Sequence, residues 1–185
     1  MNSSGNAYPY IDLILLVSIP LLDVKAEDSA LEVRYGAGSY TDIDHRLLLE
    51  ETVTPVCSPT YYNEMGPFQE FRTESEVLHS HLIRNPLEPW APWFKACGID
   101  SKEPVLGGQF NDIGLIYAAA ASGFGVALLR HRMESAWLES GRLLRLSPHS
   151  VASPYRHYLC WQPGALDRWE CAAFADWLQA SLPPA

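Results

Sequence analysis

The residues best suited to bind a small ligand are Asn111 and Asp112, which directly precede an alanine-rich apolar run. Asparagine and aspartate side chains accept hydrogen bonds from the first free N–H groups of a helix, so this pair predicts a helix that begins at Ile113. The free N–H groups and the dipole at such an end favour an anionic group such as a carboxylate. Plain capping and ligand binding both explain the pair, and the two roles are compatible.

Two other features could also serve a ligand. Gly36 and Gly38 would let a ligand approach the backbone, although a simple turn explains the two glycines equally well. Arg34 could bind an acidic ligand or form an ion pair on its own strand.

Catalytic and metal-binding patterns are absent from the sequence. It contains no nucleophile elbow, zinc-protease helix, Walker loop or dinucleotide-binding glycine pattern. His79 and His81 would face opposite ways on a strand. The cysteines have no metal-ligand spacing and are expected to be reduced thiols: Cys57, Cys97, Cys160 and Cys171. We therefore expect no catalytic residue, no metal and no cofactor, and we do not expect an enzyme.

The charge balance argues against direct nucleic-acid binding. The formal net charge is −9, from 22 acidic and 13 basic residues, and such a domain repels a phosphate backbone. A loose basic group, Arg130, Arg132, Arg142 and Arg145, has glutamates among its members and indicates a solvated helix face. By itself this chain should not bind DNA.

An apolar run from Leu13 to Leu22 raises the question of a leader or membrane segment. The residues before it carry no Lys or Arg and include Asp12, which is wrong for a secretory leader. The run is also too short to span a bilayer. It predicts a buried strand that Pro20 ends, in a cytoplasmic protein with no membrane association.

Strand and helix patterns alternate along the chain, which predicts an α/β fold. The clearest unit is a strand Val105–Phe110, a helix Ile113–Ser122 stopped by Gly123, and a strand Gly125–Leu129, a βαβ arrangement with a parallel sheet. Pro55 indicates that its strand lies at an edge or crosses between lobes. The other expected strands are Ile11–Ser18, Ala30–Tyr35, Glu51–Cys57, Leu82–Arg84, Leu143–Leu146 and Tyr155–Trp161, and the other expected helices lie around Trp90–Gly98, Met133–Glu139 and Leu166–Leu182.

Six motifs of the chain, taken in order, carry a family resemblance: Tyr8–Leu13, Leu31–Gly36, Pro55–Pro59, Phe110–Asp112 with Ala118–Leu128, Gly141–Leu143 and Phe174–Leu178. They resemble the effector-binding domain of LysR-type transcriptional regulators over roughly residues 8 to 180. Within that family, the motifs are most similar to the branch that contains the glycine-cleavage and β-lactamase regulators.

The resemblance implies two Rossmann-like lobes of periplasmic-binding-protein type II. Lobe I would comprise about residues 8–54 and 153–185, lobe II residues 55–152, and residues 1–7 would be a disordered lead. It also implies that the family's winged helix-turn-helix, and the first strand and helix of lobe I, are missing from this chain.

The implied function is effector sensing for transcription control. A small, carboxylate-bearing effector would bind in a cleft, the chain would self-associate as a dimer or tetramer, and DNA would be bound only through the missing N-terminal domain. Asp23 lies where this branch has an acidic residue in its ligand pocket, although it could also be a solvated loop residue. Ser18, Ser58 and Tyr155 lie at positions that the resemblance assigns to the hinge or the rim of the cleft. The full set of expected effector-binding residues is Ser18, Asp23, Arg34, Tyr35, Gly36, Gly38, Ser58, Phe110, Asn111, Asp112, Ile113 and Tyr155. The alternative is a stand-alone solute-binding protein of the same two-lobe fold, which would need a secretory leader.

Overall fold

The computed structural model describes residue 14 and residues 30–132 and 135–182 of the chain. The chain forms two compact units: unit 1 takes residues 1–50 and 156–185, and unit 2 takes residues 51–155. Two long strands, β2 (Asp44–Cys57) and β5 (Val151–Trp161), each contribute residues to both units. The expected lead 1–7, the strand Ile11–Ser18 except Ile14, and residues Ser18 and Asp23 lie outside the described residues.

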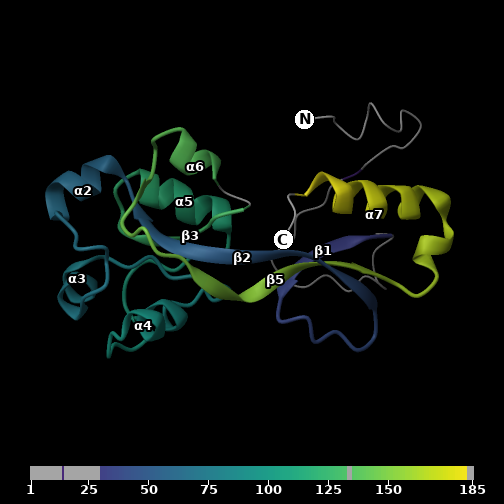
Figure 1. The fold of residues 1–185 in the computed structure, drawn as a ribbon, viewed down its shortest axis with the longest axis horizontal. Coiled ribbons are helices and arrows are strands. Elements are labelled where there is room, and N and C mark those ends of the chain that lie inside the picture. The colour runs from purple at the N-terminus through teal and green to yellow at the C-terminus, as the bar shows by residue number, and fades with distance from the viewer. Residues whose placement is uncertain (1–13, 15–29, 133–134, 183–185) are drawn as a thin grey trace. The chain divides into compact units, whose positions relative to one another are not determined.

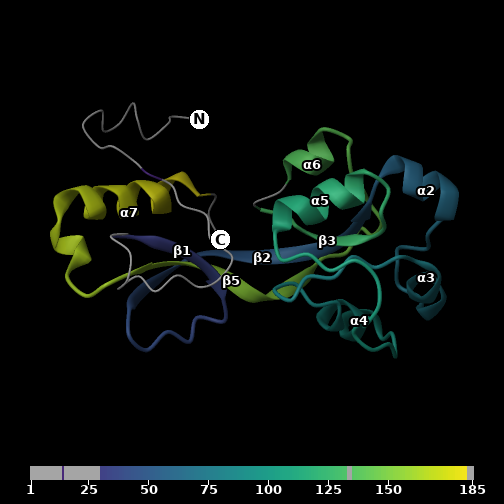
Figure 2. The ribbon, with the colours of Figure 1, turned by 180° about the vertical axis from the view of Figure 1, so that it is seen from behind.

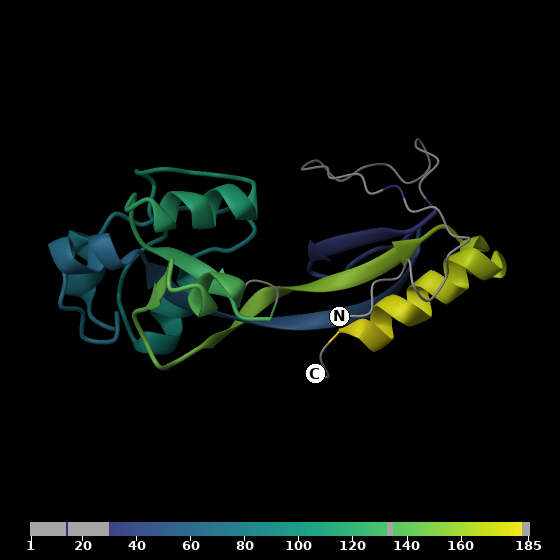
Figure 3. The same cartoon turned by 90° about the horizontal axis from the view of Figure 1, so that it is seen from above.

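Unit 1 is built on a sheet with one long helix against it (Figure 3). Strand β1 (Glu32–Gly36) pairs antiparallel with β5, with Tyr35 opposite His157. A short 3-10 turn, η1 (Ala165–Asp167), leads into helix α7 (Trp169–Ser181). The buried core of the unit consists of Leu48, Leu49, Leu159, Trp161 and Ala175.

In the sheet of unit 2, several segments run in the same direction and end at the same edge of the sheet. Strand β3 (Ala127–Arg130) runs antiparallel to β2, with Val53 opposite Arg130, and β4 (Leu144–Arg145) pairs with the end of β2. Parallel bridges join Leu82 to Val126 and Arg84 to Gln109. Segment 82–84, Gln109 and β3 therefore run the same way. We call the edge at which they end, and at which β2 enters unit 2 at Glu51, the carboxyl edge.

Helices cover both faces of the unit 2 sheet (Figures 1 and 2). Helices α5 (Ile113–Ala121) and α6 (Ala136–Glu139) lie on one face, and α3 (Glu74–His79) and α4 (Ala91–Cys97) on the other. Side chains of β3 alternate between them: Ala127 and Leu129 pack in the cluster that contains Tyr117 of α5, and Leu128 in the cluster that contains Trp93 of α4. The mixed α/β fold expected from the sequence is confirmed.

The helices with local start and stop signals form where the sequence predicts them. Asp112 caps α5, because its side chain accepts a hydrogen bond from the Leu115 N–H, and α5 ends just before Gly123. Helix α4 ends at Gly98 in the left-handed conformation, and the aromatic set Trp90, Trp93 and Phe94 is buried as core.

The expected strand Val105–Phe110 is wrong over most of its length, since only Gln109 makes a bridge. Val105 and Leu106 are 81% and 83% exposed. Tertiary contacts override the strand pattern: the Glu103 carboxylate accepts the Trp90 N–H at 3.0 Å, and Arg84 donates to the Gly107 carbonyl at 3.1 Å. These contacts pull the segment away from a regular ladder.

Strand β2 ends at Cys57, as expected, but it begins at Asp44 and not at Glu51. Strand β2 lies between β3 and β5, so of the two interpretations of Pro55 the edge strand is wrong. The other fits the structure, because β2 contributes residues to both units. Helix α2 (Pro59–Met65) follows at once and was not predicted, although Ser58 before Pro59 is a typical start signal.

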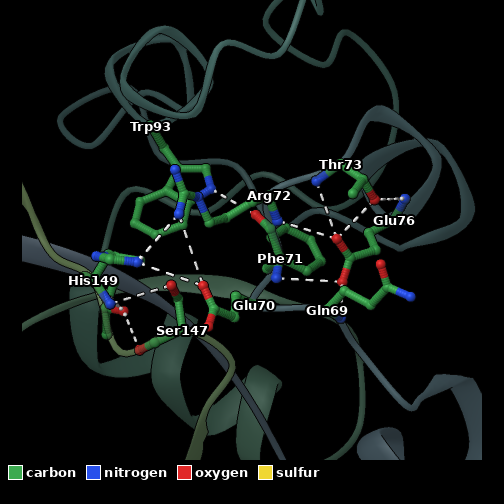
Figure 4. A network of polar contacts seen from close by, with 10 residues as sticks. Gln69, Glu70, Phe71, Arg72, Thr73, Glu76, Trp93, Ser147 and His149 are labelled. Atoms are coloured by element: carbon green, nitrogen blue, oxygen red, sulfur yellow. Dashed lines mark hydrogen bonds and ion pairs between the residues drawn. The ribbon is translucent and has the colours of Figure 1, made fainter.

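Loop 69–73 is held in place by the carboxylate of Glu76 on α3 (Figure 4). The loop contains two residues with positive φ, Glu70 at 61° and Phe71 at 54°, a strained conformation for side chains of this size. Trp93 of α4 donates its indole N–H to the Phe71 carbonyl at 3.0 Å. The carboxylate accepts hydrogen bonds from the backbone N–H groups of Gln69, Phe71, Arg72 and Thr73. These bonds tie α3, the loop and α4 together on the sheet face opposite α5.

Candidate functional site

The start of α5 lies at the carboxyl edge of unit 2. Asp112 satisfies the Leu115 N–H at 2.8 Å with its side chain and the Ile116 N–H at 3.2 Å with its carbonyl. Among the described residues, nothing accepts a hydrogen bond from the Ile113 or Gly114 N–H. This helix end therefore combines donor groups with the positive end of the helix dipole, the arrangement expected from the sequence.

A buried ion pair stands at the same edge. Arg130, the last residue of β3, donates from Nε to the Glu88 carboxylate at 2.8 Å, and the two side chains are 7% and 2% exposed. The other Glu88 oxygen accepts from the Ser153 hydroxyl of β5 at 2.7 Å. Glu88 thus joins the end of β3 to β5, although its partners lie 42 and 65 residues away in the sequence.

Arg132 extends the edge beyond the end of β3. Its backbone N–H donates to the carboxylate of the buried Glu51 at 3.0 Å. Its side-chain Nη1 is buried and has no hydrogen-bond partner in the described part of the chain. Burying a guanidinium N–H without an acceptor is unfavourable, so this atom is suited to an acceptor from a ligand.

Two further expected residues, Phe110 and Tyr155, lie at or near the same edge. Phe110 follows the bridge residue Gln109, donates its N–H to the Arg84 carbonyl at 3.0 Å, and packs its ring edge-on against Phe124 at a centroid distance of 6.3 Å. Tyr155 is half-buried and donates its N–H to the Ser153 hydroxyl at 3.3 Å. Tyr155 is thereby placed beside the Glu88 cluster.

Ser58 lies at the opposite edge of this sheet. It follows the last residue of β2, whereas Glu51 marks the start of that strand within unit 2. Its hydroxyl accepts the Tyr61 N–H at 3.1 Å and so caps α2, and the residue is 1% exposed. The structure therefore does not bring Ser58 together with the start of α5.

In unit 1, the charged and aromatic candidates of β1 are engaged by neighbouring side chains. Arg34 forms an ion pair with Glu32 at 2.8 Å and lies over the Tyr40 ring at 5.3 Å. The hydrogen bond that Arg34 donates to the Glu32 carboxylate raises the pKa of Arg34 above its usual value, against the opposing effect of burial. Tyr35 packs against the opposite ring, His157, at a centroid distance of 4.6 Å. The ion-pair interpretation of Arg34 is the one that this geometry supports.

The two glycines of unit 1 are close to tyrosine hydroxyls of the protein itself. A Cβ atom on Gly36 would lie 2.8 Å from the Tyr40 hydroxyl. Gly38 has a φ of 79°, and a Cβ there would clash with the hydroxyl of Tyr158. Turn geometry and close packing are therefore sufficient to explain both glycines.

Sequence reasoning missed the buried polar residues of the carboxyl edge. It assigned Arg130 to a solvated helix face, but Arg130 ends a strand and is 6% exposed, so that interpretation is wrong. Arg142 is exposed and stacks over Trp137 at 4.3 Å. The apolar strand before Arg130 was a signal that could have placed it at a sheet edge, but no local signal identifies Glu88 as its partner.

Within the described ranges, the structure has neither a metal-ligating cluster nor a membrane-spanning helix. No group of three or more His, Cys, Asp or Glu side chains there could hold a metal ion. All four cysteines are free thiols. None of the helices in these ranges combines the length and hydropathy needed to cross a bilayer.

The chain matches a family model described as the LysR substrate binding domain over residues 5–183. Its relatives include the HTH-type transcriptional activator AmpR of Rhodobacter capsulatus, 29% identical over 174 residues, which cover 93% of this chain and 57% of that protein. They also include the uncharacterized HTH-type transcriptional regulator y4mQ of Sinorhizobium fredii, 32% identical over 143 residues, which cover 75% of this chain and 45% of that protein. The chain thus spans about half the length of the curated relatives it matches.

Solved structures share the fold. The effector domain of AmpR from Pseudomonas aeruginosa superposes with a TM-score of 0.83 at 24% identity, over 96% of this chain and 84% of that one. The full-length Vibrio cholerae virulence activator AphB gives a TM-score of 0.73 at 19% identity, over 97% of this chain and 61% of that one. The relatives named here are transcriptional regulators and not enzymes. With a family model that matches almost its whole length, this chain belongs to the family of LysR substrate-binding domains.

Proposed function

We propose that this chain is the effector-sensing part of a LysR-type transcriptional regulator, which binds a small molecule to control transcription. The observation that carries the proposal is the match of residues 5–183 to the LysR substrate binding domain. Relatives whose names describe transcriptional activators support it.

The effector carries a carboxylate and binds at the carboxyl edge of unit 2. The start of α5 supplies the free N–H groups of Ile113 and Gly114, and Asn111 and Asp112 shape the entry to this helix. Phe110 and Tyr155 flank the edge. In unit 1, the residues predicted from the sequence stay a separate proposal: Arg34, Tyr35, Gly36 and Gly38, together with Ser18 and Asp23, which lie outside the described residues. Ser58 is left out, because it caps α2 at the other edge.

The two units correspond in this proposal to the lobes of a periplasmic-binding-protein-like sensor. The sensor self-associates as a dimer or tetramer, and DNA is contacted by a winged helix-turn-helix outside this chain. A formal net charge of −9 fits a domain that does not itself contact DNA. A regulator of this kind works in the cytoplasm.

The alternative, a stand-alone solute-binding protein of the same fold, has less support. Several relatives of the chain are named as HTH-type regulators, so shared ancestry favours a role in transcription control.

A thermal-shift screen of the chain tests the proposal. The panel consists of amino acids, cell-wall fragments and aromatic acids. Because a ligand that binds only the folded state stabilises it by mass action, we expect at least one compound to raise Tm by about 2 °C or more, in a saturable way. A panel without any saturable shift, on a chain that unfolds cooperatively, would contradict effector sensing.

A further inference from the structure

Three polar side chains of unit 2 come together at the turn 147–150, which connects β4 to β5. The Ser150 hydroxyl lies 3.2 Å from Nε2 of His131, the residue after β3, and accepts a hydrogen bond from Nη2 of Arg145 at 3.3 Å. Arg145 ends β4 and Ser150 directly precedes β5, so the contacts join the ends of three strands. We call Arg145, Ser150 and His131 the turn cluster.

Hydrogen bonds to β2 hold the backbone of the turn cluster in place. The His131 N–H donates to the Thr52 carbonyl at 3.0 Å. The Thr54 hydroxyl donates to the carbonyl of His149, the residue before Ser150, at 2.9 Å. Strand β4, which ends at Arg145, pairs antiparallel with β2. The three side chains therefore extend from an anchored backbone, as a preformed binding site requires.

The turn cluster carries positive charge that no carboxylate neutralises. In the described part of the chain, no Asp or Glu forms an ion pair with Arg145 or His131. Burial first, and the charge of Arg145 second, lower the pKa of His131, since a protonated ring would face another cation. An anion bound between the two side chains would remove this repulsion, so the turn cluster favours an anionic ligand.

Other charged groups near the turn are engaged elsewhere. His149, the other histidine of the turn, lies 3.4 Å from the Glu70 carboxylate and 3.2 Å from the Arg72 guanidinium of loop 69–73 (Figure 4). The buried Glu51 carboxylate accepts the N–H of Arg132, the residue after His131, at 3.0 Å. Within the described ranges, the acids of this region thus bind other partners and leave the turn cluster to an external anion.

The donors of the turn cluster fit a phosphate dianion. The Arg145 guanidinium and a protonated His131 ring supply two positive charges, which match the two negative charges of the dianion. The Ser150 hydroxyl can rotate and donate to a further oxygen. A tetrahedral phosphate has enough oxygens to accept from all three side chains, whereas a monocarboxylate has one charge and two oxygens in a plane.

We propose that Arg145, Ser150 and His131 form a binding site for a phosphate group, carried by free phosphate or by a phosphate monoester. His131 binds the phosphate in its protonated form and takes the proton from solvent or from the phosphate monoanion. The site uses none of the residues assigned to the effector, so the proposal goes beyond effector sensing and does not rest on it. A bound phosphate would link the end of β3 and β4 to the start of β5, a strand that contributes residues to both units.

The test adds sodium phosphate to the chain in a phosphate-free buffer at pH 7, with sodium chloride at matched ionic strength and sodium acetate as comparisons. The readouts are Tm and the pKa of His131, followed by the NMR shifts of its ring and assigned with His131→Gln. Phosphate is expected to raise Tm in a saturable way and to raise the pKa of His131 to about 6.5 or above. Chloride should do neither, and acetate should bind at least about tenfold more weakly.

Methyl phosphate, the simplest monoester, distinguishes the two sources of the phosphate group. Binding tighter than that of inorganic phosphate supports a site for an ester, and weaker binding supports a site for free phosphate.

Variants separate binding at the turn cluster from the general stabilisation that phosphate gives to folded proteins. Arg145→Gln should weaken the saturable response at least about tenfold. Ser150→Ala, which removes one neutral donor, should weaken it about fivefold. Arg142→Gln removes another exposed arginine, which stacks over Trp137, and should respond as the wild type. Arg145→Lys should retain a partial response and provides the comparison if Arg145→Gln does not fold.

A saturable response in Arg145→Gln equal to that of the wild type would overturn the site. So would a wild type in which phosphate leaves the pKa of His131 unchanged and raises Tm no more than chloride does. Acetate that binds as tightly as phosphate would overturn the assignment of the ligand as a phosphate group.

Discussion

At the scale of single residues, the ion pair of Glu88 and Arg130 is the interaction whose loss should matter most. Both side chains are nearly fully buried, so removing one partner leaves an uncompensated charge. We expect Glu88→Gln to lower the free energy of unfolding by about 3–5 kcal/mol, measured by urea denaturation.

Glu50→Gln is the control for this variant. Its partner Arg156 also lies at 2.8 Å, but both side chains are about half exposed, and water screens such a pair. A loss in Glu88→Gln no larger than in Glu50→Gln would contradict the structural role of the buried pair.

The buried cysteines give a second prediction at this scale. Burial raises the pKa of Cys57 to about 12 and that of Cys160 to about 11, so neither thiol forms the reactive thiolate near neutral pH. In a reaction with an aromatic disulfide reagent, these two cysteines should label only when the chain unfolds. Rapid labelling of Cys57 in the folded protein, located by mass spectrometry, would show that this core is open.

His131 gives a pH dependence with a definite sign. Burial, and then the charge of Arg145, lower the pKa of His131 in the folded chain. The unfolded chain therefore binds this proton more readily, and stability should fall as pH drops below about 6.5, the ordinary histidine pKa. Between about pH 7.5 and about pH 5.5, His131→Gln should lose less stability than the wild type in urea titrations. Equal losses in the two proteins would show that His131 makes no contribution.

At the scale of elements, the left-handed turn after β1 can be tested against a matched site. Gly38 and Gly141 have similar φ values of 79° and 70°, but only at Gly38 would a Cβ meet another side chain, that of Tyr158. Gly141→Ala should cost about 1 kcal/mol of unfolding free energy from the backbone alone. Gly38→Ala should cost more, since the Tyr158 ring must also move. Equal losses of unfolding free energy in the two variants would mean that the Tyr158 ring moves aside without a measurable cost.

Elements with local signals were predictable, and elements set by distant contacts were not. Asp112 marks the start of α5 and Gly98 marks the end of α4. Both could be recognised in the sequence because caps act within one helical turn. The prediction of a strand over Val105–Phe110 was wrong, because hydrogen bonds of Glu103 and Arg84 connect this segment to other parts of unit 2. Helix α2 was missed although Ser58 and Pro59 carry its start signal.

At the scale of the whole molecule, the family could be inferred from sequence, and the site only in part. The helix start at Asp112 was predictable because such a start has a local sequence pattern. The contacts of Glu88 with Arg130 and Ser153 were not predictable, because only the tertiary fold brings these residues together across 42 and 65 residues. The buried partners of a sheet edge depend on register, and register is set by the fold as a whole.

Effector binding at the carboxyl edge of unit 2, as proposed, can be located residue by residue. The most direct measurement is the set of backbone amide shifts of the chain, titrated with the panel compound that raises Tm most. If the effector binds at this edge, the largest saturable changes fall on Ile113 and Gly114, and the signals of α2 and Ser58 at the opposite edge do not change. Changes centred on Ser58 and α2, with Ile113 and Gly114 silent, would contradict it.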